Sequence, residues 1–129
     1  MSDDLFERGL AIRKAVLGNE YVERALASAD AFSQPLQKLV TEYCWGAVWG
    51  RDGLPRRDRS LINLAMIATL NRPHELKIHV KGALRNGLKR EEIMETFLQV
   101  AIYAGVPAAV DSFRIAREAF AELEAEKSK

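Results

Sequence analysis

The sequence contains one cysteine, Cys44, among its 129 residues. A single cysteine excludes a disulfide within the chain, a Cys-x-x-Cys redox pair and a zinc site built from several cysteines. Charge of one sign is not in excess either, because 19 lysines and arginines stand against 18 aspartates and glutamates. This balance does not indicate bulk attraction to nucleic acid or to an anionic membrane, so we expect neither as a partner.

Long apolar runs are absent as well. No stretch approaches the run of about 20 apolar residues that a helix needs to span a bilayer. The first four residues, Met-Ser-Asp-Asp, are acidic where a signal peptide would be basic, so we expect a cytoplasmic protein. At this length we expect a single domain over residues 1–129, which buries roughly two thirds of the surface that the unfolded chain exposes.

Strand signals are also lacking, because no run of β-branched residues is bounded by turn residues. Nearly every segment has helical periodicity instead, which predicts an all-α fold of six to seven helices. A capping box at Asp4 and Glu7 predicts a first helix that ends at Gly18. A second helix is expected from an N-cap at Asn19 to about residue 29, and a third from residues 33–35 to Gly50. The later ones are expected from Pro55 to residue 70, from Pro73 to Gly87, from Arg90 to Gly105, and from Pro107 into a charged tail, residues 122–129, which we expect to fray.

The segment from Leu61 to Leu70 is apolar nearly all round, with only Asn63 and Thr69 polar. A helix without a polar face has to be covered on all sides, and a chain this short has few other helices to cover it. We therefore expect a second subunit to cover part of this helix, and thus an oligomer. The alternative is that the segment is the central helix of a monomer's core.

Histidine is scarce, since the chain has only His74 and His79. Glu75 lies four residues before His79 on a predicted helix, and an i, i+4 pair faces one way, so the two side chains can act on one substrate. The alternative is a surface ion pair. His74 directly follows Pro73 at the start of this helix, and we expect it to be exposed.

A second group of candidate residues lies between positions 42 and 51. Trp45 and Trp49 are one helical turn apart, and Glu42 precedes them on the same face. With Glu42 and Arg51 nearby, the two indoles could wall a dry pocket, although core packing is the usual explanation for such a pair. We expect Cys44 to be a small buried apolar residue.

Several motifs occur together in a consistent order. They are residues 42–49, Arg51 with residues 53–54, residues 57–61, residues 70–73, Glu75 and Leu76 with His79, residues 83–87 and residues 103–107. In this order and spacing they resemble the carboxymuconolactone decarboxylase family, over about Gly9 to Leu123. The resemblance implies a helical fold like that of alkylhydroperoxidase D and a ring-like homo-oligomer, often a hexamer.

The chain departs from the thiol peroxidases of the wider superfamily, which carry Cys-x-x-Cys-x-x-x-His on this helix. The histidine position is His79, but the cysteine positions fall on Arg72 and Glu75. The acidic residue of their preceding helix falls near Ser60. A thiol-dependent antioxidant peroxidase is therefore an alternative that this chain supports poorly. A helical ligand-binding module without catalysis is the other alternative.

The resemblance implies a small lactone dicarboxylate as substrate and a reaction without a metal or organic cofactor. γ-Carboxymuconolactone would lose one carboxylate as CO2 and become the β-ketoadipate enol-lactone, in the protocatechuate branch of the β-ketoadipate pathway. The departing electron pair can flow through the conjugated C=C bond into the lactone carbonyl, so the substrate is its own electron sink. The protein has to stabilise that oxyanion, hold the acetate arm and protonate the ring's α carbon.

His79 is the candidate acid, because an imidazole titrates near neutral pH, and Glu42 or Glu75 could orient or reprotonate it. A dianionic substrate calls for guanidinium groups, which match carboxylates with a planar fork. The candidate substrate-binding residues are Arg51, Arg59, Arg72, Trp45, Trp49 and Tyr103. For each arginine the alternative is a solvated surface position, and for the tyrosine it is a place in the core. No residue set indicates a metal site.

Overall fold

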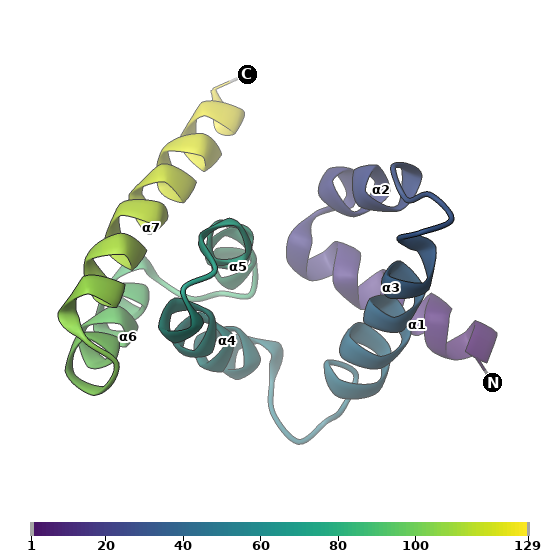
Figure 1. The fold of residues 1–129 in the computed structure, drawn as a ribbon, viewed down its shortest axis with the longest axis horizontal. Helices are drawn as coiled ribbons and strands as arrows, with labels where there is room; N and C mark the ends of the chain where they lie inside the picture. The colour runs from purple at the N-terminus through teal and green to yellow at the C-terminus, as the bar shows by residue number, and fades with distance from the viewer. Residues whose placement is uncertain (1, 129) are drawn as a thin grey trace. The chain divides into compact units, whose positions relative to one another are not determined.

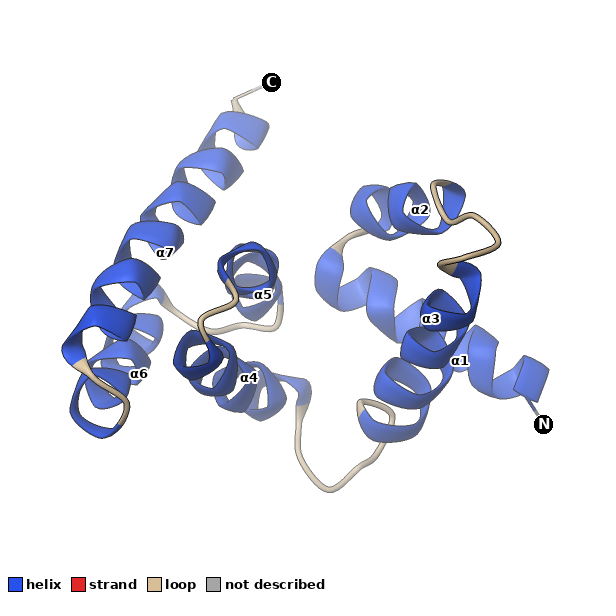
Figure 2. Cartoon of the chain, viewed as in Figure 1, coloured by secondary structure: helices blue, strands red, loops and turns tan. Residues whose placement is uncertain are grey.

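The computed structural model describes residues 2–128, with side chains from residue 4 onward. These residues form seven α-helices and one π-helical segment. Figures 1 and 2 show helices joined by loops, with no strand among the described residues, so the predicted all-α fold is confirmed. The elements are α1 (Ser2–Leu17), α2 (Asn19–Ala27), α3 (Gln34–Leu39), the π-helix η1 (Val40–Val48), α4 (Arg56–Leu70), α5 (Pro73–Arg85), α6 (Arg90–Tyr103) and α7 (Val106–Lys127). The chain forms two compact units, which divide between Arg56 and Arg57.

Two of the predicted helix ends depend on glycine. Gly18 follows α1 with φ 94°, and Gly87 follows α5 with φ 97°. Only glycine adopts this left-handed region without a steric cost, so both breaks follow from the sequence. The predicted turn at residues 51–53 is also present, between η1 and α4.

The predicted caps at the first two helices are wrong. Asp4 and Glu7 lie inside α1, which already begins at Ser2, and Asn19 is the first residue of α2, whose N-cap is Gly18. Acidic residues are favourable throughout the first turn of a helix as well as at its N-cap, so the sequence pattern does not show which of these positions Asp4 occupies. α2 also ends at Ala27, two residues earlier than expected.

In the first unit, α1 packs closely against η1. A Cβ atom on Gly9 would lie 1.9 Å from the carbonyl oxygen of Thr41, and one on Gly46 would lie 2.7 Å from that of Leu5. Only glycine therefore permits this approach of the two backbones. The sequence predicted one continuous α-helix from residues 33–35 to Gly50, but its second half is π-helical, and the Trp49 N–H bonds the Cys44 carbonyl five residues back.

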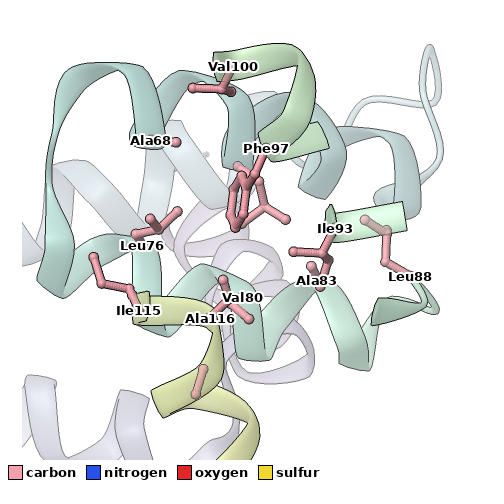
Figure 3. Close-up of a cluster of buried hydrophobic side chains, with 12 residues drawn as sticks. Ala68, Leu76, Val80, Ala83, Leu88, Ile93, Phe97, Val100, Ile115 and Ala116 are labelled. Carbon is pink, nitrogen blue, oxygen red and sulfur yellow. The ribbon is translucent and has the colours of Figure 1, made fainter. Parts of the chain in front are cut away.

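The core of the second unit is formed by apolar residues of α4, α5, α6 and α7. Phe97 of α6 is fully buried among these side chains, close to those of α5 and α7, as Figure 3 shows. Its ring meets that of Phe113 edge to face, with the centroids 5.9 Å apart. α5 contributes Leu76, Val80 and Ala83 at i, i+4 and i+7, so one face of the helix that carries His79 is fixed in the core.

The charged end of α7 does not fray as expected, because the helix continues to Lys127. Glu122 accepts hydrogen bonds from Lys77 at 2.8 Å and from Lys81 at 2.7 Å, both on α5. Glu124 pairs with Arg90 of α6 at 2.7 Å. These charges hold the last turns of α7 against its neighbours, which composition alone does not reveal. Lys129, the last residue of the predicted tail, lies outside the described residues.

The apolar helix α4 is buried on one side only. Leu64 and Ala68 lie in the core, whereas Ile62 is 44% exposed, Met66 50% and Leu70 62%. The central-helix alternative, in which the whole helix is covered, therefore does not describe this chain, and a second subunit remains the prediction for the exposed side. Among residues 2–128, no helix has both the length and the apolar composition for a membrane span.

Candidate active site

His79 lies in the middle of α5, which begins at Pro73 and ends before Gly87, as the sequence predicted. The side chain is partly buried. Its Nδ1 atom lies 3.4 Å from the side-chain nitrogen of Asn63, which belongs to α4. The apolar face of α5 therefore anchors the helix, and His79, beside this face, meets a polar group of the preceding helix.

Burial lowers the pKa of His79 from 6.5 to about 4. The expectation that this imidazole titrates near neutral pH is therefore wrong for the protein without ligand. The physical cause is desolvation, which disfavours the charged ring. At neutral pH the ring is neutral and offers one N–H and one lone pair.

Two further polar residues join α4 to the end of α5. Ser60 is 2% exposed, and its hydroxyl accepts a hydrogen bond of 2.8 Å from the side-chain amide of Asn86. We call Ser60, Asn63, His79 and Asn86 the α4–α5 polar cluster. Sequence reasoning did not identify Asn63 or Asn86 as site residues, although a lone asparagine within an apolar run was a signal for the first.

Arg59 precedes Ser60 on α4 and lies one turn before Asn63. The side chain is partly buried, and its Nε atom is buried without a hydrogen-bond partner. A buried guanidinium nitrogen without a partner costs free energy, which an anionic ligand would recover. Of the three candidate arginines, Arg59 is thus the one with a buried donor that has no partner among the described residues.

The other candidates of the second unit are exposed. Glu75 lies one turn before His79, in the first turn of α5, and is exposed. Arg72 is exposed, and its Nη1 donates to the carbonyl oxygens of Leu70 at 3.2 Å and Asn71 at 3.5 Å, at the end of α4. Tyr103 is 85% exposed at the end of α6, so the alternative of a core tyrosine is wrong. His74 is exposed as expected.

The remaining candidates lie in the first unit, on or just after η1. Trp45 and Trp49 are buried and stacked, with centroids 4.7 Å apart and ring planes at 27°. Glu42 is 5% exposed and lines a cavity of about 440 Å³ together with residues of α1, α2 and α3. Arg51 follows η1 and is exposed. Glu42 and Trp45 thus lie on η1, and Trp49, which stacks on Trp45, follows it directly.

Cys44 is exposed, contrary to the expectation that it is buried. In η1 the buried positions are 41, 42, 45 and 46, the next buried position is 49, directly after η1, and Cys44 falls between them. Sequence reasoning also missed Arg13, a buried guanidinium that donates to Gln37 at 2.9 Å and to Thr41 at 3.1 Å.

Among residues 2–128, no group of three or more His, Cys, Asp and Glu side chains is arranged to hold a metal ion. The candidate residues themselves offer the chemistry of polar side chains. The second unit provides a neutral imidazole and a guanidinium with an unused donor. The first provides a buried carboxylate, Glu42, and two buried, stacked indoles.

Comparison with known proteins places the chain in a family. The model of the carboxymuconolactone decarboxylase family matches residues 34–118. A nitrosuccinic acid decarboxylase of Metarhizium robertsii is 41% identical over 119 residues, which cover 92% of this chain and 83% of the relative. A 4-carboxymuconolactone decarboxylase of Acinetobacter baylyi is 37% identical over 118 residues, which cover 92% and 88%. An uncharacterised 15.0 kDa protein of Paracoccus denitrificans is 32% identical over 90 residues, which cover 67% and 66%. The chain therefore belongs to the carboxymuconolactone decarboxylase family.

Proposed function

We propose that this protein decarboxylates γ-carboxymuconolactone without a cofactor and releases CO2 and the β-ketoadipate enol-lactone. The observation that carries the proposal is the similarity over 92% of the chain to a 4-carboxymuconolactone decarboxylase. The local arrangement around His79 supports it, because a partly buried imidazole and a guanidinium with an unused donor suit an anionic substrate. The proposal includes the pathway of this substrate, the protocatechuate branch of the β-ketoadipate pathway.

The reaction proceeds in two steps. The bond between the ring's γ carbon and the departing carboxylate breaks, and its electron pair flows through the C=C bond into the lactone carbonyl oxygen. A proton then reaches the α carbon and restores the neutral lactone carbonyl. Because the substrate accepts the electron pair itself, the protein contributes binding, charge stabilisation and proton delivery.

We assign proton delivery to His79. Its pKa of about 4 makes the ring neutral before the substrate binds. Two carboxylates beside the ring would raise this pKa, since nearby negative charge favours the imidazolium. His79 would then take a proton from solvent as the substrate binds and pass it to the α carbon after CO2 has left. Glu75, one turn before the ring on α5, remains the proposed group that orients or reprotonates it, and Glu42 of the first unit remains the other candidate acid.

Arg59 is our first choice for a carboxylate of the substrate, because its buried Nε has no partner. Arg51 and Arg72 stay in the proposal as exposed guanidinium groups that a ligand can recruit. Trp45, Trp49 and Tyr103 also stay in the proposal as substrate-binding residues. These assignments rest on residue chemistry, and each can be tested separately by substitution.

Nitrosuccinate is a second candidate substrate, favoured by the 41% identity to a nitrosuccinic acid decarboxylase. In both compounds the carbon that would lose CO2 also carries a carboxymethyl arm. In both, a neighbouring group accepts the electron pair: a conjugated lactone in one case and a nitro group in the other. A site that grips two carboxylates and delivers one proton therefore suits either compound.

The test is to supply each compound, freshly prepared, to the purified protein in D2O and to follow CO2 release and the product by NMR. Faster CO2 release from the lactone than in buffer, with deuterium on one face of the α carbon, supports the proposal and a fixed acid. Release from nitrosuccinate alone would transfer the assignment to the second candidate. Binding without CO2 release from either compound would favour the ligand-binding module, and peroxide-dependent thiol oxidation would favour the peroxidase.

A further inference from the structure

The two polar residues of the apolar run in α4 use their side chains differently. The hydroxyl of Thr69 donates to the carbonyl oxygen of Ala65 at 2.8 Å, within its own helix, and the residue is exposed. Asn63 is partly buried, and its amide nitrogen faces Nδ1 of His79 on α5. A polar group at a partly buried position costs free energy unless it has a partner, so the imidazole explains why an amide is tolerated here.

A hydrogen bond from Asn63 to Nδ1 would fix which ring nitrogen carries the proton. An amide nitrogen is only a donor, so a hydrogen bond between the two atoms requires a lone pair on Nδ1 of His79. The neutral ring then carries its proton on Nε2, at the other edge of the imidazole. The low pKa of His79 agrees with this arrangement, because a neutral ring has the lone pair that Asn63 needs.

We propose that Asn63 is a positioning residue, whose amide holds His79 in the tautomer that presents the Nε2 proton, and not a lone pair, to the substrate. The inference rests on the proposed function in so far as it makes His79 the proton donor. A lone pair at this edge would repel the anionic substrate and could not stabilise the oxyanion. Asn63 thus acts on the reaction only through the ring.

An amide suits this task better than other side chains because it has a donor and an acceptor. When substrate binding protonates His79, Nδ1 becomes a donor, and a half-turn of the terminal amide of Asn63 brings its oxygen to face Nδ1. A leucine would offer neither group. An aspartate would favour Nδ1–H throughout and would raise the pKa of His79 by about 1 to 3.

The test uses protein labelled with ¹⁵N in histidine and NMR correlations that distinguish a protonated ring nitrogen from an unprotonated one. The chain has only two histidines, so the variant His74→Gln assigns the signals of His79. For wild type at pH 7 we expect a protonated Nε2 and an unprotonated Nδ1. For Asn63→Leu we expect a mixture of tautomers, and for Asn63→Asp a protonated Nδ1. Thr69→Val is the matched control and should leave the wild-type pattern.

The proposal is overturned if wild type carries its proton on Nδ1, or if all Asn63 variants keep the wild-type pattern. Circular dichroism shows whether each variant has folded. If Asn63→Leu does not fold, the tautomer of His79 in Asn63→Asp tests the proposal, because this variant changes only the terminal amide to a carboxylate. A wild-type pattern in folded Asn63→Asp then counts against the proposal.

Kinetics connect the tautomer to the reaction. With γ-carboxymuconolactone, kcat of Asn63→Leu should fall by about tenfold or more, since a positioned acid contributes roughly 10²- to 10⁴-fold, while KM changes little. If wild type shows the expected tautomer but releases no CO2 from either compound, the proposed function fails and the effect of Asn63 on the ring stands. If wild type is active but the tautomer does not respond to Asn63, the positioning role fails and the function stands.

Discussion

The side-chain amide of Asn86 donates a hydrogen bond of 2.8 Å to the hydroxyl of Ser60. The bond ties the C-cap of α5 to the first half of α4, two turns of α5 away from His79. Because Ser60 is 2% exposed, water does not readily replace the amide as its partner. The α4–α5 polar cluster is thus held at two points, this bond and the contact of Asn63 with His79.

Asn86→Ala should lower the free energy of unfolding by about 1 to 3 kcal/mol, because it leaves a buried hydroxyl without its donor. Urea unfolding at pH 7 measures the change. Thr69→Val, which removes an exposed hydroxyl bonded within its own helix, should stay within about 0.5 kcal/mol of wild type. Equal stability of the two variants would show that the Ser60 bond contributes nothing.

The helix ends at two glycines followed from the sequence. Gly18 and Gly87 end helices because a left-handed φ favours glycine, and this preference depends on no distant residue. The π-helical turns of η1 were not predictable in this way. They accompany the close approach of α1, which depends on Gly9 meeting the backbone at Thr41, 32 positions further along the chain.

In the candidate site, too, local features could be predicted from the sequence and contacts between distant residues could not. Periodicity located His79 on a helix, but its low pKa arises from burial, and burial is set by the packing of several helices. The contact with Asn63 joins residues 16 positions apart on different helices, so no local pattern specifies it. Likewise, Arg59 was one of three equivalent arginines in the sequence, and only the structure distinguishes its buried Nε.

The stability of the protein should fall as the pH decreases from about 6.5 to about 4. The pKa of His79 is about 4 in the folded state and near 6.5 in the unfolded chain, so in this window only the unfolded state binds the proton. Above pH 6.5 both states are neutral and the group contributes no pH dependence. The loss attributable to His79 should reach roughly 2 to 3 kcal/mol at the acid end.

His79→Gln should remove this part of the pH dependence. The measurement is urea unfolding of wild type and variant at pH 7.0 and pH 5.0, and the comparison is the difference between the two proteins at each pH. The other titrating groups are common to both proteins, so their contributions to the pH dependence cancel in this difference. If wild type and His79→Gln lose the same free energy between the two pH values, the ring is not desolvated as described.

Arg59→Met should raise KM for a dicarboxylate substrate by about tenfold or more, because it removes the buried donor offered to a carboxylate. Arg117→Met is the matched control, since Arg117 is exposed on α7 and lies outside the proposed site. Steady-state kinetics of CO2 release give KM and kcat for both. An unchanged KM and kcat in Arg59→Met would return this arginine to a structural role.

The exposed apolar side of α4 should be an interface between copies of this chain. Ile62, Met66 and Leu70 recur at i, i+4 and i+8, so they form one stripe that water covers in the single chain. We expect wild type to elute in gel filtration with light scattering at a multiple of the monomer mass. Met66→Glu places a charge within the stripe and should shift the protein towards monomer, because an unpaired buried charge is costly. Ala121→Glu, at an exposed position of α7, should keep the wild-type mass. A wild-type protein that is monomeric at every concentration would reject the assembly and would leave the stripe without a partner.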